Sequence, residues 1–235
     1  MKIEIWSDYV CPFCYIGKRR FEEALEKTGL EGKVEVVYKA YELGPNAPAT
    51  TDETIQESLA GKYNISIDEA KSMTDNVVVQ AESVGLKYNF DAMHPANTFN
   101  AHRLAKLAEQ KGLGEEMTEQ LLQAYFIESK RIGLDDVLIE ILVKVGISKE
   151  RAEEVLKSEA FAEEVKADIT EAGQIGVQGV PFFVINRKYA ISGAQPAETF
   201  AEALQKVAEE EGIRPKLTIL NSDASGACKD DNCDI

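Results

Sequence analysis

The sequence predicts an α/β protein in which a long helical block interrupts a smaller domain of strands and helices. Apolar and polar residues alternate at 2–7, and a short apolar run lies at 34–40, so two strands are expected near the start of the chain. Strand patterns return near its end, at 180–185 and 188–192. The stretch 45–158 carries helical spacing of apolar residues instead. These observations predict one mixed domain that is divided by a helical insertion.

Three helices complete the mixed domain. A helical pattern over 12–27 joins the first two strands, and such a crossover implies that these strands are parallel. A second helix is expected at 159–173, and a third begins at Pro196, since proline suits the first helical position. Asn186 and Arg187 form the tight turn between the last two strands. Without the insertion the order is β-α-β-α-β-β-α, which is the order of the thioredoxin fold.

The chain therefore divides into four expected segments. Residues 1–44 and 159–213 are the two parts of the thioredoxin-like domain. Residues 45–158 are the inserted α-helical domain, in which Ser66 and Glu69 form a capping box ahead of an apolar helix. The polar C-terminal tail, 214–235, carries Cys228 and Cys233.

The composition is that of a globular protein without a nucleic-acid or membrane partner. The 235 residues are 44% hydrophobic and have a formal net charge of −15. Phosphate backbones favour clustered Lys and Arg, and the sequence has no basic stripe. No apolar run is long enough to cross a bilayer, and the first residues lack the basic start and apolar run of a secretory signal. We expect a cytoplasmic protein, in which close cysteine pairs indicate redox chemistry or metal binding.

The first such pair is Cys11-Pro12-Phe13-Cys14, between the first strand and the first helix. A thiolate at a helix N-terminus meets unpaired N–H groups and the positive end of the helix dipole. The two-residue spacing lets Cys14 reach a mixed disulfide on Cys11, so we expect Cys11 to be the attacking, more exposed sulfur and Cys14 the buried resolving one. A C-x-x-C pair is also half of a zinc site, but zinc needs a second, similar pair, so no metal is assigned.

Val180-Pro181 is the second element of the expected site. A proline that opens a strand of a central sheet is awkward unless the strand is protected or the peptide bond is cis. In a thioredoxin fold this loop faces the C-x-x-C tip. We expect a cis bond at Pro181 that leaves the backbone of Val180 free to pair with a substrate peptide and keeps metal away from the cysteines.

Four stretches together resemble the DsbA family, specifically its cytoplasmic FrnE-like branch. They are WSDYVCPFCYIGK at 6–18, NTFNAHR at 97–103, GVQGVPFF at 176–183 and YAISGAQP at 189–196. The resemblance covers about residues 1–210. It implies a thioredoxin fold with an inserted helical domain, dithiol chemistry at Cys11 and Cys14, and a cis Pro181. Periplasmic DsbA has a histidine at the position of Phe13, and Phe13 cannot stabilise a thiolate by charge, so a strongly oxidising character is not expected.

The predicted function is that of a thiol–disulfide oxidoreductase that acts on protein or peptide thiols without a cofactor. In the same superfamily, hydroxychromene-carboxylate isomerases and kappa-class glutathione transferases use a serine at the position of Cys11 to activate glutathione. Two cysteines argue against that glutathione-dependent chemistry here, but glutathione stays open as a small thiol partner. Direction of catalysis depends on redox potential and is not predicted.

The tail pair, Cys228 and Cys233, leaves three interpretations open. It is a second redox couple, a soft-metal clamp helped by Asp230 or Asp231, or an inert polar segment. A redox-sensing or metal-sensing binding protein that uses this pair is therefore a further alternative. The histidines at 94 and 102 are expected to be structural rather than catalytic.

Overall fold

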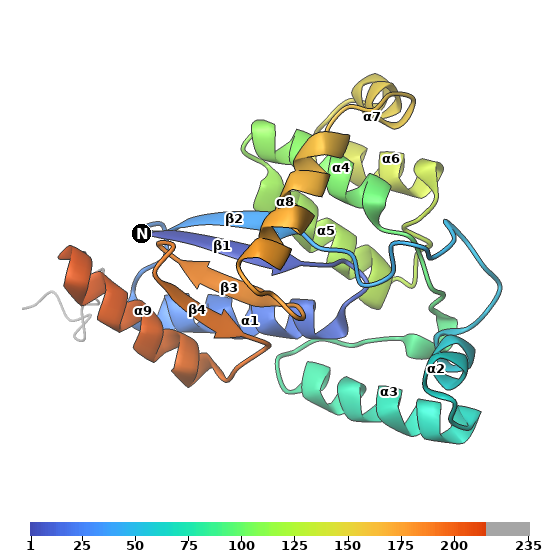
Figure 1. Ribbon diagram of the computed structural model, residues 1–235, viewed down its shortest axis with the longest axis horizontal. Helices are drawn as coiled ribbons and strands as arrows, with labels where there is room; N and C mark the ends of the chain where they lie inside the picture. The colour runs from blue at the N-terminus through green and yellow to red at the C-terminus, as the bar shows by residue number, and fades with distance from the viewer. Residues whose placement is uncertain (215–235) are drawn as a thin grey trace, which may run out of the picture.

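The computed structural model describes residues 1–214 of the chain, and Cys228 and Cys233 lie outside this range. Its sheet has the strand order β2-β1-β3-β4 (Figure 1). The strands are β1 (Lys2–Ser7), β2 (Glu35–Ala40), β3 (Phe182–Ile185) and β4 (Tyr189–Ser192). β1 runs parallel to β2 and antiparallel to β3, and β3 and β4 form an antiparallel hairpin. The predicted parallel opening and closing hairpin are both confirmed.

The turns of the mixed domain follow from its residue types. Asn186 and Arg187 have φ values of 49° and 56°, the left-handed conformation that a two-residue hairpin turn needs. The start of β3 was predicted at Val180 but lies at Phe182. Pro181 has no N–H to donate to a strand ladder, so the pairing begins only after it. Pro196 was predicted to start the last helix but precedes it as the N-cap, because its ψ of 151° is extended rather than helical.

Helices cover both faces of the sheet (Figure 1). On one face, α1 (Pro12–Thr28) and α9 (Ala197–Glu211) share a hydrophobic core with strand residues that include Ile3, Ile5 and Phe183. On the other face, α8 (Ala162–Gln174) packs on Trp6 and Val184 through Ala172. The mixed domain is therefore a three-layer structure with the sheet in the middle.

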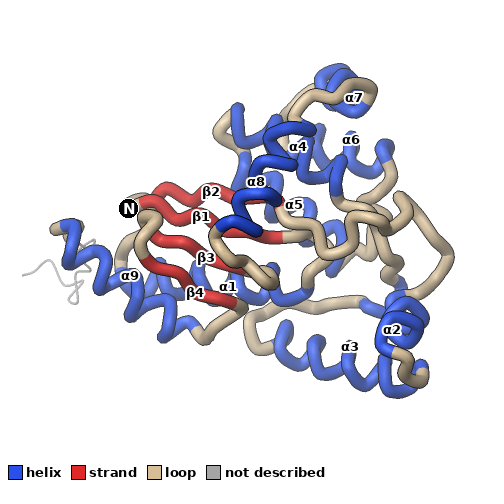
Figure 2. The backbone as a smooth tube through the Cα atoms, viewed as in Figure 1, coloured by secondary structure: helices blue, strands red, loops and turns tan. Residues whose placement is uncertain are grey.

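No strand lies between β2 and β3 in the described chain, as predicted. Before α8, the segment forms α2 (Ile55–Tyr63), α3 (Ile67–Glu82), the short 3-10 helix η1 (Phe90–Ala92), α4 (Phe99–Gln110), α5 (Gly114–Phe126), α6 (Asp135–Lys144) and α7 (Lys149–Leu156). Figure 2 shows α4 to α7 beyond one end of the sheet and α2 and α3 below them. The capping box of Ser66 and Glu69 is present at the start of α3.

The helical block shares its core with α1. Tyr15 and Ile16 of α1 are buried in the same hydrophobic cluster as Tyr88, Tyr125 and Phe126 of the block. The rings of Tyr88 and Phe126 stack at 4.6 Å between centroids. The helix that begins at Cys11 therefore packs on the sheet with one side and on the helical block with another.

Candidate active site

Cys11 lies at the end of the turn that connects β1 to α1. It is the N-cap residue of the helix, and Pro12 occupies the first turn. The Cys11 N–H donates to the carbonyl of Asp8 at 3.1 Å, and the Cys14 N–H donates to the carbonyl of Cys11 at 3.0 Å. The Cys11 side chain makes no cap bond to the helix, so its sulfur is directed elsewhere.

The sulfur of Cys11 faces the loop before β3. Its Sγ donates a hydrogen bond to the carbonyl oxygen of Val180 at 3.4 Å, and the Val180–Pro181 peptide bond is cis, as predicted. The structure thus brings together two pairs that lie far apart in the sequence. It differs from the expectation in one respect: the Val180 carbonyl is engaged by the Cys11 thiol rather than free.

Both sulfurs are buried and reduced. Cys11 is 4% exposed and Cys14 is 3% exposed, so the structure buries both almost equally rather than leaving Cys11 open to solvent. The helical block explains why, because the Tyr88 hydroxyl donates to the carbonyl of Pro12 at 2.7 Å and covers the helix tip. Phe13 is the exposed side chain of the motif, at 37%.

The two cysteines differ in electrostatics rather than in exposure. Burial raises the pKa of the Cys14 thiol well above its ordinary value, and the hydrogen bond and charge of Cys11 raise it further. Hydrogen bonds from the Ser7 side chain and the Asp8 backbone oppose this shift. Cys14 therefore keeps its proton while a charge is present on Cys11, which suits a residue that acts second.

The basic residues of α1 are paired rather than directed at the cysteines. The buried Lys18 ammonium lies 2.6 Å from Glu119 of α5 and also contacts Glu22. Arg19 contacts the same two carboxylates, and the Tyr15 hydroxyl donates to Glu119 at 2.6 Å. Glu119 was not predicted, because it lies about a hundred residues from its partners and no local spacing marks it.

Asp8 is a second residue that the sequence did not single out, although it stands within the WSDYVC stretch. Its carboxylate is fully buried; one oxygen accepts from the Leu43 N–H at 2.7 Å, and the other lies 3.4 Å from His102 Nε2. His102 Nε2 also lies 3.0 Å from the Tyr41 carbonyl. Burial, together with the charge of Asp8, raises the pKa of Glu42, while His102 opposes this shift. His102 links α4 to the mixed domain, which agrees with a structural role.

The strand order, the C-x-x-C motif at the start of α1 and the cis proline that faces it are those of a thioredoxin-like redox protein. The family model of the DsbA-like thioredoxin domain matches residues 2–205. The chain therefore belongs to the DsbA-like family.

Individual relatives agree with this family. The probable DsbA oxidoreductase SCO1869 from Streptomyces coelicolor has a TM-score of 0.84 and 38% identity, over 100% of this chain and 99% of that chain. The protein YwbO of Bacillus subtilis (strain 168) is 29% identical over 205 residues, 86% of this chain and 94% of that protein.

Two more distant structures share the fold alone. A 2-hydroxychromene-2-carboxylate isomerase has a TM-score of 0.70 and 15% identity, over 90% of this chain and 98% of that chain. The cytosolic disulfide reductase DsbM from Pseudomonas aeruginosa, solved with GSH, has a TM-score of 0.63 and 14% identity, over 89% of this chain and 100% of that chain. None of the helices within residues 1–214 combines the length and apolar composition that a membrane crossing requires.

Proposed function

We propose that this protein is a thiol–disulfide oxidoreductase of protein or peptide thiols, in which Cys11 attacks and Cys14 resolves. The observation that carries the proposal is the position of Cys11, which caps α1 and contacts the Val180 carbonyl beside Pro181. A thiolate formed there lies near the positive end of the α1 dipole. No cofactor is needed, because the two sulfurs carry both electrons.

The reaction has two exchange steps. The Cys11 thiolate attacks one sulfur of a substrate disulfide, which forms a mixed disulfide and releases the other substrate sulfur as a thiolate. Cys14 then loses its proton and attacks Cys11 Sγ, which releases the reduced substrate and leaves a Cys11–Cys14 disulfide. Run in reverse, the same steps oxidise a substrate dithiol. The raised pKa of Cys14 orders the steps, since Cys14 becomes a better nucleophile once the charge on Cys11 has been consumed.

We place this activity in the cytoplasm and in the FrnE-like branch of the family. The four sequence stretches that resemble that branch support the assignment, and so does the shared fold of the cytosolic reductase DsbM. Phe13, exposed beside the cysteines, supports an apolar contact with a polypeptide substrate.

Glutathione is the second candidate thiol. Both sulfurs are almost inaccessible, and a small thiol reaches such a site with less rearrangement than a folded protein does. DsbM was solved with GSH, which supports the same idea. An isomerase or transferase reaction on a small molecule remains the less favoured alternative, because those relatives use serine where this chain has Cys11.

Replacing Cys14 tests the proposal directly. Cys14→Ser should stop the reaction after the first exchange, because nothing remains to expel the partner from Cys11. The full-length variant, expressed in its own cells and isolated under alkylating conditions, should carry adducts that reductant removes. Mass spectrometry of these adducts identifies the substrate class: polypeptides support the proposal, and glutathione alone moves the assignment to the small thiol.

Cys11→Ser is the matched control. It retains a buried thiol of raised pKa and should trap far less material. Equal trapping by both variants would contradict the roles given to Cys11 and Cys14.

A further inference from the structure

The outer edge of β2 leaves backbone groups without partners. The backbone N–H groups of Glu35 and Tyr41 donate to residues of the first strand segment, Met1 and Ser7. The backbone N–H and carbonyl groups of the odd-numbered residues of β2 therefore face β1, and those of the even-numbered residues face away from the sheet. Two outward groups are occupied: the Ala40 N–H donates to Asp168, and the Tyr38 carbonyl accepts from Lys106. Within residues 1–214, no group bonds the N–H and carbonyl of Val36 or the N–H of Tyr38. Three successive outward backbone groups of β2 are therefore free to bond an added strand.

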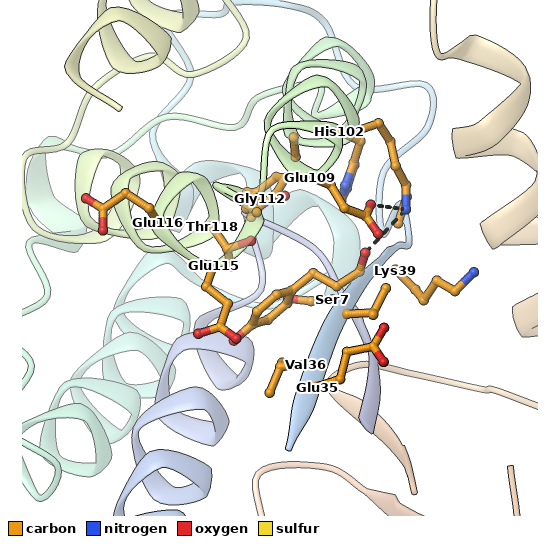
Figure 3. Close-up of a pocket in the computed structure, with 17 residues that line it drawn as sticks. Ser7, Glu35, Val36, Lys39, His102, Glu109, Gly112, Glu115, Glu116 and Thr118 are labelled. Atoms are coloured by element: carbon orange, nitrogen blue, oxygen red, sulfur yellow. Dashed lines mark hydrogen bonds and ion pairs between the residues drawn. The ribbon is translucent and has the colours of Figure 1, made fainter. Parts of the chain in front are cut away.

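A cavity of about 640 Å³ lies along this edge. Figure 3 shows it between β2 and the two helices α4 and α5, with Thr118 projecting from α5 toward the strand. All six residues of β2 line it. Edge strands are usually blocked by charges, proline or a covering element, whereas here the covering helices stand away from the strand.

The inner wall of the cavity consists of packed side chains. Tyr9 and Thr118, which line it, are both buried. An occupant of the cavity is therefore recognised by the free backbone groups of β2. The free backbone groups need both donors and acceptors from that occupant, and an extended polypeptide supplies both in alternation.

The rim of the cavity is acidic. Glu115 and Glu116 lie exposed and without an ion pair within the described chain in the first turn of α5, and Glu35, 3.7 Å from Lys2, is exposed at the start of β2. The lysines of the cavity are neutralised. Asp168 lies 2.7 Å from both Lys39 and Lys106, Glu171 lies 3.3 Å from Lys39, and Glu109 lies 3.0 Å from Lys106. The unpaired charge at the rim is therefore negative, and the whole chain adds a net charge of −15.

We propose that the cavity along β2 binds an extended polypeptide segment with basic side chains, which pairs with Val36 and Tyr38 as a short added strand. The acidic rim selects basic residues. A second copy of this chain is a poor occupant, since two acidic rims would face each other. The residues from 215 onward contain more acidic than basic residues and lack the same complementarity.

Binding is tested on the full-length chain with a cysteine-free probe, so the outcome is independent of the redox proposal. The probe is fluorescein-labelled acetyl-Lys-Val-Lys-Val-Arg-Val-amide, and anisotropy reports binding. We expect saturable binding below about 1 mM. A probe with glutamate in place of every basic residue, or with alternate amides N-methylated, should bind at least about fivefold more weakly.

Two protein variants locate the site. Val36→Pro removes one outward N–H at an edge position that tolerates proline, and should weaken binding about fivefold relative to Val36→Ala, which keeps that N–H. Glu115→Lys with Glu116→Lys should weaken binding by a similar factor at low salt and less at high salt. The matched control is Glu163→Lys with Glu164→Lys, which changes two adjacent glutamates in the first turn of α8 by the same charge.

Several results would overturn the proposal. These are no saturable binding by the full chain, equal affinities of Val36→Pro and Val36→Ala, and equal losses in the two charge-reversed variants. A dimer that Val36→Pro dissociates in sedimentation experiments would show a second copy as the occupant, and would also overturn it. If Val36→Pro does not fold, the variant with Glu115→Lys and Glu116→Lys still tests the site, because both substitutions are at exposed positions.

Discussion

At the scale of single residues, contact between α1 and the Pro181 loop depends on the absence of a side chain at Gly17. A Cβ at this position would lie 2.9 Å from Pro181 Cγ and 3.4 Å from Ala194 Cβ. The distance to Pro181 is shorter than van der Waals contact allows, and the distance to Ala194 is at the lower limit of ordinary contact. The proline that faces Cys11 is thus held against a helix surface that only glycine provides.

Gly17→Ala should therefore destabilise the protein and move the Pro181 loop. We expect a loss of about 1–3 kcal/mol in the free energy of unfolding, measured with urea, and slower reduction of insulin. Gly61→Ala is the control, since a Cβ at Gly61 in α2 meets nothing within 4 Å. That variant should gain up to about 1 kcal/mol from helix propensity. Equal effects of the two substitutions would refute the contact.

Burial also changes how the two cysteines are distinguished. A helix tip alone predicts an exposed first sulfur, but Tyr88 and Val180 cover Cys11 as completely as the helix covers Cys14. The two cysteines are distinguished by electrostatics instead, because burial and the neighbouring Cys11 raise the pKa of the Cys14 thiol. In the proposed mechanism, a substrate therefore has to displace these covering groups before it exchanges with Cys11.

At the scale of elements, Glu119 joins α5 to the active-site helix. Burial alone would raise its pKa, but Lys18, Tyr15 and Arg19 together lower it below the ordinary value. A carboxylate whose pKa is depressed in the folded state stabilises that state at any pH above its unfolded pKa, about 4.3. This contribution is lost as the pH falls through the lower pKa of the folded protein.

Glu119→Gln should cost about 1–3 kcal/mol at pH 7, because Lys18 keeps Glu22 as a partner and Glu119 is partly exposed. The difference from the natural protein should shrink as the pH falls below about 4.3. Urea unfolding at a series of pH values measures it. Glu153→Gln, which removes an exposed partner of Lys157, should leave stability almost unchanged. A difference that stays constant with pH would contradict the role of the charge.

At the scale of the whole molecule, the mixed domain and the helical block act as one support for the site. The largest hydrophobic cluster contains α1 residues together with residues of α4, α5 and α6. The tip of α1 is covered from the block by Tyr88 and from the sheet by the Val180 loop. The site therefore depends on both parts of the chain.

The tail cysteines are predicted to be accessory to this site. Cys228→Ser with Cys233→Ser should retain most of the insulin-reducing activity, because the proposed mechanism needs only Cys11 and Cys14 as its attacking and resolving sulfurs. Assays of the double variant beside Cys14→Ser compare the two pairs on the same substrate. Near-complete loss in the tail variant would show that electrons pass through the tail to Cys11 and Cys14.

Local sequence determined the elements and the reactive motif. Alternation at 2–7, the Asn186-Arg187 turn and the capping box at Ser66 predict their structures correctly, because each depends on contacts between residues close in the chain. The spacing of Cys11 and Cys14 and the resemblance to the DsbA family likewise predicted the fold.

Tertiary structure alone decided what surrounds the motif. The burial of Cys11, the pairing of Lys18 with Glu119, the contact of Asp8 with His102 and the open edge of β2 all join residues from distant segments. Such contacts depend on how the helical block packs against the sheet, and no local pattern records that packing. Sequence therefore identified the two cysteines, whereas packing decided their burial, the raised pKa of the Cys14 thiol and the free groups beside β2.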